Sequence, residues 1–460
     1  MDRRAFIVSS LGGSLMGLPK QMTGAGSPYP SSDGEVRELA GMPLERLREE
    51  IRHELFQQFV PFMNRYVIDH EQGGFQCQLN PDGTHPDNDK NTWFQGRGLW
   101  VYSYLYNHFG HDPEYLAVAR KTFDLIMRSK PSGKDQMWPA KLSREGKPLT
   151  APQMTIGADV SIAEGLAEYS KATGDIQFWN LAKEILLKCV RQYDRPDYAP
   201  NVVAQYHGPK PVNFPGARTQ GVAMILTGTI TQVLEMHPDA ELERIIGNCV
   251  DAVINRHFNP EFQLNNELLN HDYSRPANEL AQFVYTGHCI ETLAIILFEA
   301  VRTQNGNLFR TAAERLQRHV EVAWDEVYGG AFRSLNNVDE DHWEVNKVLW
   351  AQEETLNGCL LVIDYAGAPW ARELYARTYH YIRSTYYVPR WSYSFWISGG
   401  DRKVTVQPNL ERVEHYHHPK NLMHSLLVLD RLIGRGGKIS PLFAPSARDD
   451  GREVPLSKKA

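Results

Sequence analysis

Apolar residues recur at helical spacing along most of the chain, and the helical segments come in pairs separated by short polar turns. The first clear pair runs from about Thr92 to Phe109 and from Pro113 to Arg128, with Gly110-His-Asp-Pro113 between the two segments. Glycine readily ends a helix, aspartate caps the next one and proline fits its first position. The pattern therefore predicts two helices joined by a tight turn.

Turns of the same kind recur along the chain at a nearly constant interval. The first residues of these turns are Gly110, Gly174, His237, Asn305 and Gly367. Successive gaps are 64, 63, 68 and 62 residues, which predicts an array of helical hairpins. Two helices are left over, at about 43–65 and 419–432, and pairing them closes the array into a ring. We therefore expect an all-α fold, an (α/α)6 barrel of twelve helices. A linear solenoid is the alternative, but neither terminal helix resembles a polar cap.

A second repeat concerns the loops. Asp69-His-Glu-Gln-Gly-Gly-Phe75 is echoed by Asp325-Glu-Val-Tyr-Gly-Gly-Ala-Phe332, and both stretches precede the first helix of a pair. Together with Trp391–Ile397, these segments are predicted to form short β-hairpins. Long loops lead into the N-termini of the first helices, so the loops and six N-termini should share one mouth of the ring. Loops carry binding chemistry, and helix N-termini favour a developing anion.

The two ends of the chain differ in composition from the helical region. Met1-Asp-Arg-Arg is followed by a short apolar run to Leu18 and a Pro/Gly/Ser-rich stretch to about Asp33. Two arginines before a weakly apolar segment resemble a twin-arginine export signal, to the periplasm or beyond. A disordered start of a cytoplasmic protein is the alternative. We expect a signal and linker over 1–33, the catalytic barrel over 34–435, and a flexible tail over 436–460.

Net charge and cysteine content limit the classes of molecule that the protein is expected to bind. The formal net charge is −6 and no basic stripe occurs, which excludes nucleic acid as a partner. No segment beyond the N-terminus has the ~18 consecutive apolar residues of a membrane span, so the mature form is expected to have no membrane segment. The five cysteines are scattered without a CxxC, so free buried thiols are predicted. The expected partner is a small carbohydrate, bound by a monomer or homodimer.

One buried helix carries the first candidate chemistry. In Tyr285-Thr-Gly-His-Cys-Ile-Glu291 the spacing places His288 and Glu291 on one helical face, ahead of the apolar run Leu293–Phe298. A carboxylate beside a histidine can fix the imidazole tautomer for proton transfer. A structurally satisfied His–Glu contact in the core is the alternative interpretation of this pair alone.

Similar groups occur near the other helix starts, each about one period from the last. They are Arg97, Asp159, Arg218 or Gln220, His288, Glu354 and His417. Two histidines facing each other across a pocket, with arginine and carboxylates around them, suit proton abstraction beside a carbonyl. The base takes a C–H proton, while the cation and helix ends stabilise the enediolate.

Several motifs also resemble a known family, the N-acylglucosamine 2-epimerases, over about 45–433. The motifs are Asp69-His-Glu-Gln-Gly-Gly-Phe75, Lys90-Asn-Thr-Trp-Phe-Gln-Gly-Arg-Gly-Leu-Trp-Val-Tyr102, Ser143-Arg-Glu-Gly-Lys-Pro148, Gly287-His-Cys-Ile-Glu291, Lys347-Val-Leu-Trp-Ala-Gln-Glu-Glu354 and Tyr416-His-His-Pro-Lys420. The resemblance implies an (α/α)6 barrel and an isomerase that needs neither a metal nor a redox cofactor. It implies that His288 and His417 are the acid/base pair, that Arg97 is the pocket arginine, and that Glu291 and Glu354 orient the histidines or the sugar.

A second set of residues is predicted to bind the substrate, on the motifs or on spacing. The set is Lys90, Trp93, Gln95, Trp350, Gln352, Tyr416, Asp159 and Gln220. The chain also departs from the family pattern. Ala217-Arg-Thr-Gln-Gly221 lacks the histidines of cellobiose epimerases, Lys420 replaces an arginine, and Trp391–Trp396 lacks a glutamate. The first departure disfavours a disaccharide substrate.

The leading hypothesis is C2 epimerisation of a reducing sugar through an enediolate. The same groups could serve an aldose–ketose isomerase. A glycoside hydrolase or lyase would instead need a carboxylate pair, for which Asp159 and Glu354 are the candidates. A sugar-binding protein without chemistry is a further class. A metal site of His288 with His415, His417 and His418 is disfavoured because the cluster lacks a ligand frame.

Overall fold

Within the unit of residues 34–460, the structure, a computed structural model, describes residues 35–80, 82–199, 214–388, 393–394, 397–398 and 413–443. The predicted export signal over 1–33 lies outside the described residues.

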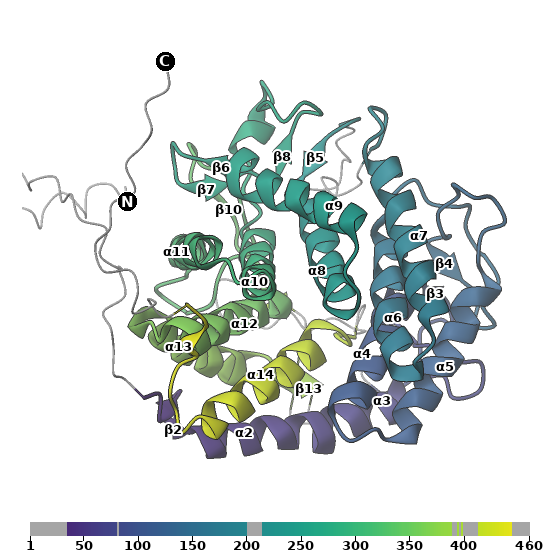
Figure 1. The fold of residues 1–460 in the computed structure, drawn as a ribbon, viewed down its shortest axis with the longest axis horizontal. Helices are drawn as coiled ribbons and strands as arrows, with labels where there is room; N and C mark the ends of the chain where they lie inside the picture. The colour runs from purple at the N-terminus through teal and green to yellow at the C-terminus, as the bar shows by residue number, and fades with distance from the viewer. Residues whose placement is uncertain are drawn as a thin grey trace, which may run out of the picture. The chain divides into compact units, whose positions relative to one another are not determined.

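Twelve long helices make up most of the described part of the chain and follow one another around a ring (Figure 1). The inner helices are α4 (Thr92–His108), α6 (Gly157–Thr173), α8 (Gln220–Met236), α10 (Thr286–Arg302), α12 (Leu349–Ala366) and α14 (His417–Gly434). The outer helices are α5 (Pro113–Arg128), α7 (Ile176–Tyr193), α9 (Ala240–Asp251), α11 (Gly306–Ala323), α13 (Pro369–Thr385) and the continuous run α2 (Leu44–His53), η1 (Glu54–Phe59) and α3 (Val60–Tyr66). Short helices η3 (Ala252–Arg256), η4 (Glu279–Gln282) and η5 (Pro441–Phe443) complete the set.

The inner helices close on themselves. Each contacts the next in order from α4 to α14, and α14 contacts both α4 and α2. The first and last long helices therefore pair, as the sequence period predicts. The (α/α)6 barrel is confirmed, and the alternative of an open solenoid is wrong.

The tight turns follow from local sequence. Asp112 and Asp175 each accept a hydrogen bond from the backbone N–H two residues on, at the starts of α5 and α7. Gly174 ends α6 in the left-handed region with φ of 70°, where a side chain would be strained. In α5, Ala119 and Leu125 face the inner helices and are fully buried. The outer helices are thus amphipathic, whereas α10 and α12 are buried on nearly every side.

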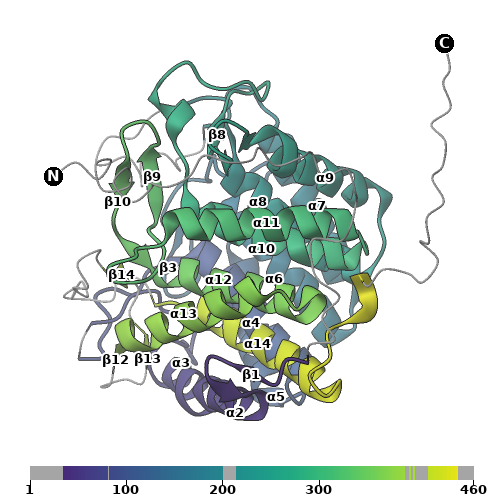
Figure 2. The ribbon, with the colours of Figure 1, turned by 90° about the vertical axis from the view of Figure 1, so that its left-hand side faces the viewer.

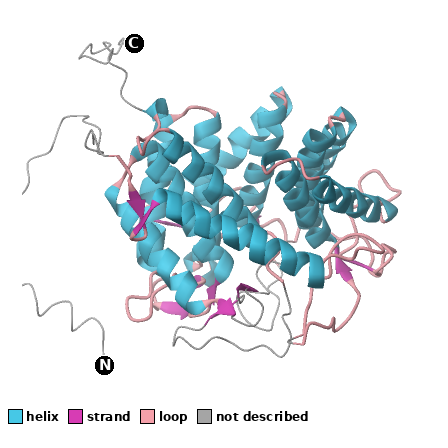
Figure 3. Ribbon diagram, turned by 90° about the horizontal axis from the view of Figure 1, so that it is seen from below, coloured by secondary structure: helices cyan, strands magenta, loops and turns pink. Residues whose placement is uncertain are grey.

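Short strands gather mainly at the end of the barrel where the inner helices begin (Figures 2 and 3). The antiparallel pairs are β1 (Glu38–Leu39) with β2 (Met42–Pro43), β3 (Lys90–Asn91) with β4 (Lys141–Leu142), β5 (Arg218–Thr219) with β8 (Leu268–Leu269), β6 (Phe258–Asn259) with β7 (Leu264–Asn265), β9 (Ser334–Asn337) with β10 (His342–Glu344), β11 (Lys347–Val348) with β14 (Ile397–Ser398), and β12 (Tyr387–Val388) with β13 (Tyr393–Ser394). Strands β3, β5 and β11 each run directly into an inner helix. The described strands that lead into inner helices therefore share one mouth, as predicted for the loops, whereas most of the predicted hairpin over 391–397 lies outside the described residues.

The two echoed loops are locked in the same way. Lys90 is fully buried and donates to Asp69 at 3.0 Å and to the Gly73 carbonyl at 2.6 Å. Before α12, Lys347 is equally buried and donates to Asp325 at 2.6 Å. A buried ammonium needs such partners, because an unpaired charge in the interior is costly.

A glutamine in the first turn of each following helix also holds the loop, through hydrogen bonds to its backbone. The Gln95 amide bonds both backbone groups of Phe75, at 2.8 and 3.1 Å. The Gln352 amide bonds both backbone groups of Ala331, at 2.8 and 2.9 Å. The repeat seen in the sequence is therefore a repeat of structure, with two loops held to two inner helices by the same side chains.

The C-terminal segment corrects one boundary. Residues 436–443 do not form a free tail, since Gly437 accepts a hydrogen bond from the Val36 backbone and Ser440 donates to the Asp364 carbonyl. Phe443 packs on Phe309 with ring centroids 4.7 Å apart. Residues 444–460 lie outside the described part.

Two further predictions concern composition. All five cysteines are free and buried, as predicted from their scattered spacing. Among the described residues, no helix has the length and apolar character needed to cross a bilayer.

Candidate active site

His417 lies at the first position of α14 and is almost fully buried. Its Nδ1 is 3.0 Å from Glu354 Oε1, on α12. The same oxygen accepts a hydrogen bond from Lys420 at 2.9 Å, and Asn357 donates to the other oxygen at 3.0 Å. Burial raises the pKa of Glu354, but the charge of Lys420 and the contact with His417 outweigh it, and the pKa is lowered. A carboxylate held ionised in this way fixes the orientation of the imidazole.

Arg97, on α4, faces the other ring nitrogen. Its Nη1 is 3.4 Å from His417 Nε2. The guanidinium lies between two aromatic rings, 4.6 Å from the centroid of Trp93 and 4.3 Å from that of Tyr416. The Tyr416 hydroxyl donates to Glu164 at 2.7 Å. Stacking fixes a delocalised cation with little loss of its hydrogen-bonding capacity, so Arg97 is held beside the imidazole.

His288, in the first turn of α10, has a partner that the helical spacing did not indicate. Its Nδ1 is 3.0 Å from Glu267 Oε1, and Glu267 is fully buried in the loop before α10. The Gly221 N–H donates to the same oxygen at 3.2 Å. The carboxylate beside His288 Nδ1 is therefore Glu267 and not the predicted Glu291, which lies 4.0 Å from His417 Nδ1 instead.

Trp350 connects the two histidines. Its ring centroid lies 6.0 Å from that of His288 and 5.6 Å from that of His417. The two imidazoles are therefore separated by no more than the sum of those distances, a span that a single sugar ring and its substituents can bridge. The prediction that residues 288 and 417 converge inside the ring is confirmed. Each imidazole is oriented by its own buried glutamate.

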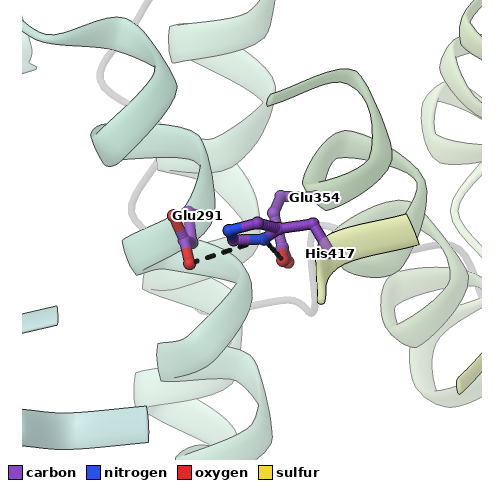
Figure 4. Close-up of side chains that lie close together, drawn as sticks. All are labelled: Glu291, Glu354 and His417. Atoms are coloured by element: carbon purple, nitrogen blue, oxygen red, sulfur yellow. Dashed lines mark hydrogen bonds and ion pairs between the residues drawn. The ribbon is translucent and has the colours of Figure 1, made fainter. Parts of the chain in front are cut away.

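Glu291 belongs to the site through the other histidine. Its Oε1 lies 4.0 Å from His417 Nδ1, as the dashed line in Figure 4 shows. Glu291, Glu354 and His417 offer ligand atoms within 4.8 Å of one another, a grouping that could hold a metal ion. Lys420 and Arg97 contact the same groups, and their charges oppose a divalent cation there. The absence of a metal requirement stays a prediction.

Three polar residues predicted to bind substrate lie elsewhere. Lys90, Gln95 and Gln352 are fully buried and have their side-chain donors on backbone carbonyls or on Asp69, where they lock the two echoed loops. Their motif positions are structural, so the substrate-binding assignment is corrected. Trp93, Trp350 and Tyr416 do lie around Arg97 or the histidines.

Asp159 and Gln220, placed by spacing, have their side chains on other partners. Asp159 is fully buried and pairs with Lys188 at 2.6 Å. The Gln220 amide donates to Thr292 at 3.4 Å within the core. Arg218, the alternative to Gln220, bonds the Tyr193 carbonyl. These three assignments are therefore corrected as well.

The histidines flanking His417 do not build a metal site with it. His415 Nε2 is 2.8 Å from the Phe94 carbonyl oxygen, and its ring stacks on that phenylalanine. His418 Nδ1 is 2.5 Å from Glu353 Oε1. Burial raises the pKa of Glu353 to about 7 although His418 opposes the rise. Both rings are committed to other partners.

The comparisons with known proteins agree with the geometry. The family model for N-acylglucosamine 2-epimerase matches residues 73–420. The chain belongs to the N-acylglucosamine 2-epimerase family. It is 25% identical over 422 residues to the bovine N-acylglucosamine 2-epimerase (Bos taurus), covering 88% of this chain and 96% of that protein. It is 23% identical over 353 residues to the cellobiose 2-epimerase of Bacteroides fragilis, covering 70% and 83%.

A solved structure has the same fold. The cellobiose 2-epimerase from Bacillus thermoamylovorans superposes with a TM-score of 0.72 at 16% identity, over 83% of this chain and 99% of that one. An unsaturated glucuronyl hydrolase specific for heparin also matches, with a TM-score of 0.56 at 10% identity. Since the toroid is shared by different activities, the family model and its relatives carry the function. The protein is an isomerase-class carbohydrate enzyme, a sugar C2 epimerase.

Proposed function

We propose that the enzyme epimerises a reducing sugar at C2 by a two-base mechanism. One of His288 and His417 removes the C2 proton from the open-chain sugar, and the other delivers a proton to the opposite face. The observation that carries this proposal is the pair of imidazoles flanking Trp350, each with its own buried carboxylate. Imidazole is the side chain that most readily gains and loses a proton near neutral pH.

Arg97 is proposed to stabilise the intermediate. Removing the C2 proton places negative charge on the oxygens of an enediolate. The guanidinium beside His417 Nε2 is held by two aromatic rings, so it is already positioned when that charge develops. Preorganised charge of this kind is usually the largest single contribution to catalysis.

The proposed substrate is a monosaccharide. Relatives of this chain are named for N-acylglucosamine and for cellobiose. The third inner helix begins Gln220-Gly221 and provides no histidine to the site, which is the departure that disfavours a disaccharide. Gly221 also lies against the His288 ring.

The two carboxylates considered for a glycoside hydrolase, Asp159 and Glu354, do not form a catalytic pair. Asp159 pairs with Lys188 at 2.6 Å and Glu354 pairs with Lys420 at 2.9 Å. Burial raises the pKa of Asp159, although Lys188 opposes the rise. The contacts of this carboxyl group are Lys188 on α7 and the Trp138 backbone N–H, not Glu354. A glycosidase needs two carboxyl groups on either side of one bond.

The proposal is tested by proton NMR in D2O with free hexoses, N-acetylhexosamines and uronic acids. We expect conversion of one sugar to its C2 epimer, with solvent deuterium at C2 of the product. An aldose–ketose isomerase would yield the ketose as the main product. Full retention of the C2 hydrogen in a converted product would overturn the enediolate mechanism.

We also propose that residues 1–33 direct export of the folded enzyme. The two arginines at positions 3 and 4 support this, and free buried thiols are compatible with folding before export. Cell fractionation of the full chain, with Arg3→Lys/Arg4→Lys as the comparison, tests it. Equal distribution of both proteins among the fractions would contradict the proposal.

A further inference from the structure

A second opening lies at the opposite end of the barrel from the strands. A cavity of about 830 Å³ runs between the inner helices. Along α6 its wall includes Ser161, Glu164, Glu168 and Lys171, which span about 15 Å at 1.5 Å per residue. Its outer end includes the exposed residues Lys171 and His237 near the tight turns. The cavity therefore begins at the surface and follows the barrel axis inward.

The inner end of this cavity is the back wall of the active site. Arg97, Tyr416, Lys420 and Glu291 all line it. Glu291 is also 4.0 Å from His417 Nδ1. A side chain that faces both the catalytic imidazole and the cavity gives His417 a connection to solvent that does not pass through the mouth where the sugar enters.

The middle of the cavity is lined by carboxyl groups without a Lys or Arg partner within salt-bridge distance in the described part of the chain. Glu164 accepts hydrogen bonds from Tyr416 at 2.7 Å and Gln232 at 3.1 Å. Glu168 accepts one from Asn107 at 2.6 Å and lies 3.8 Å from His108 Nε2. Burial raises the pKa of both carboxyl groups, although their hydrogen bonds oppose the rise. Such groups can both hold and release protons.

The proposed reaction requires such a connection. When one histidine takes the C2 proton and the other gives one up, each turnover leaves the first imidazole one proton richer and the second one proton poorer. The enzyme cannot repeat the same conversion until both are reset. His417 is only 3% exposed, and substrate occupies the space in front of it.

We propose that this axial cavity, with Glu291, Glu164 and Glu168, is a proton-return route between His417 and bulk solvent on the face opposite the substrate mouth. The cavity wall carries Glu164, Glu168 and Gln232 among apolar side chains. Its volume is many times the ~30 Å³ of one water molecule, so a water chain held by these polar groups fits inside it. The inference rests on the proposed two-base function and adds to it a specific path and two carboxyl groups, Glu164 and Glu168, beyond the reacting pair.

The protons balance along this route. After taking the C2 proton, the imidazolium of His417 releases one proton to Glu291 or to water beside it. That proton leaves through the cavity, while bulk solvent supplies one proton to His288. Water at the inner end then takes the one remaining proton from Nε2 while Nδ1 gains one, which restores the Nδ1–H that faces Glu354. In the reverse conversion the cavity delivers a proton to His417.

The test compares the first turnover with steady-state turnover. Glu168→Gln keeps the shape and removes a proton-holding group, and Ile225→Trp fills part of the cavity. The matched controls are Glu241→Gln, an exposed glutamate outside the cavity, and Leu442→Trp on the outer surface. In both test variants the single-turnover rate should stay within about twofold of wild type, while steady-state kcat falls about tenfold. A small buffer acid such as imidazole should restore part of the loss.

The outcomes separate this inference from the proposed function. Epimerisation by wild type with solvent deuterium at C2 establishes the function independently. If both test variants then match the controls in steady-state kcat, the route is overturned while the function stands. A fall in single-turnover rate equal to the fall in kcat would also overturn it, because that result indicates damage to the catalytic groups. Glu168→Gln is nearly isosteric, so the test does not depend on folding of the tryptophan variant.

Discussion

At the scale of single residues, the site consists of two histidine–glutamate pairs with different origins. Glu354 reaches His417 from the neighbouring inner helix, whereas Glu267 reaches His288 from a loop. In the proposed two-base mechanism, each carboxylate stabilises the imidazolium that forms in one direction of the reaction. The two pairs have equivalent chemistry, as a reversible epimerisation requires.

Glu267→Gln tests that equivalence. The amide keeps a hydrogen bond to His288 but removes the charge that stabilises its protonated form. We expect kcat to fall roughly 10²-fold, the lower end of what a positioned acid or base contributes, with little change in KM. Glu279→Gln, exposed at the start of η4, is the control and should match wild type. Unchanged kcat in Glu267→Gln would show that Glu267 is not the partner His288 uses.

The sequence could indicate both histidines but only one of their partners. His288 and His417 stand at helix starts one or more periods apart, and periodicity predicts that such positions converge. Glu267 lies 21 residues before His288, in a loop with no period, so its approach depends on how the loop packs. Lys90 and Gln95 were predicted to bind substrate but instead hold a loop. A sequence motif does not distinguish residues that bind a sugar from residues that hold the loop around it.

At the scale of elements, the inner helices determine where the site residues can stand. Residue 221 is the second residue of α8, and its missing side chain makes room for the His288 ring. A Cβ at Gly221 would lie 2.9 Å from two atoms of that ring and 3.2 Å from Glu267 Oε1. The helix–helix spacing at the mouth thus depends on this glycine.

Gly221→Ala should therefore displace His288. We expect kcat to fall by about tenfold or more, since a shift near 1 Å at a catalytic group can cost as much as 10²-fold. Gly247→Ala is the matched control, because its Cβ meets no atom within 4 Å. In a helix interior that change stabilises by up to about 1 kcal/mol. Thermal unfolding and kcat are measured for both variants. If Gly221→Ala had the same kcat as Gly247→Ala, the close contact between residue 221 and the His288 ring would not matter for activity.

The elements themselves were predictable because their signals are local. Asp112 and Asp175 cap helices within two residues of themselves, and Gly174 permits its own turn. The echoed loops were visible for the same reason. Residues 436–443 were predicted to be part of a flexible tail over 436–460. Their contacts with the barrel, such as Phe443 on Phe309, join residues far apart in the sequence, which no local pattern reports.

At the scale of the whole molecule, two buried salt bridges hold the mouth together. Burial raises the pKa of Asp325, but Lys347 and two backbone N–H groups lower it further than burial raises it. Burial also raises the pKa of Asp69, but Arg144 and Lys90 lower that pKa by more. An acid whose pKa is lower when folded adds stability above its unfolded pKa of about 3.9.

Acid should therefore weaken the fold through these pairs. The free energy of unfolding of wild type should fall as pH drops from about 5 toward the lowered pKa values. Asp325→Asn removes one of the two contributions, so its stability should be lower at neutral pH and should fall less steeply in acid. Denaturant unfolding at several pH values measures both. Parallel pH profiles for wild type and Asp325→Asn would contradict the assignment.

The central claim is that two histidines act on opposite faces of one sugar, and hydrogen exchange in D2O tests it most directly. His417→Asn and His288→Asn should each lose epimerisation. Each should still exchange the C2 hydrogen of one epimer only, and the two variants should exchange opposite epimers. If either variant still epimerised, or exchanged both epimers alike, a two-base mechanism at this site would be wrong.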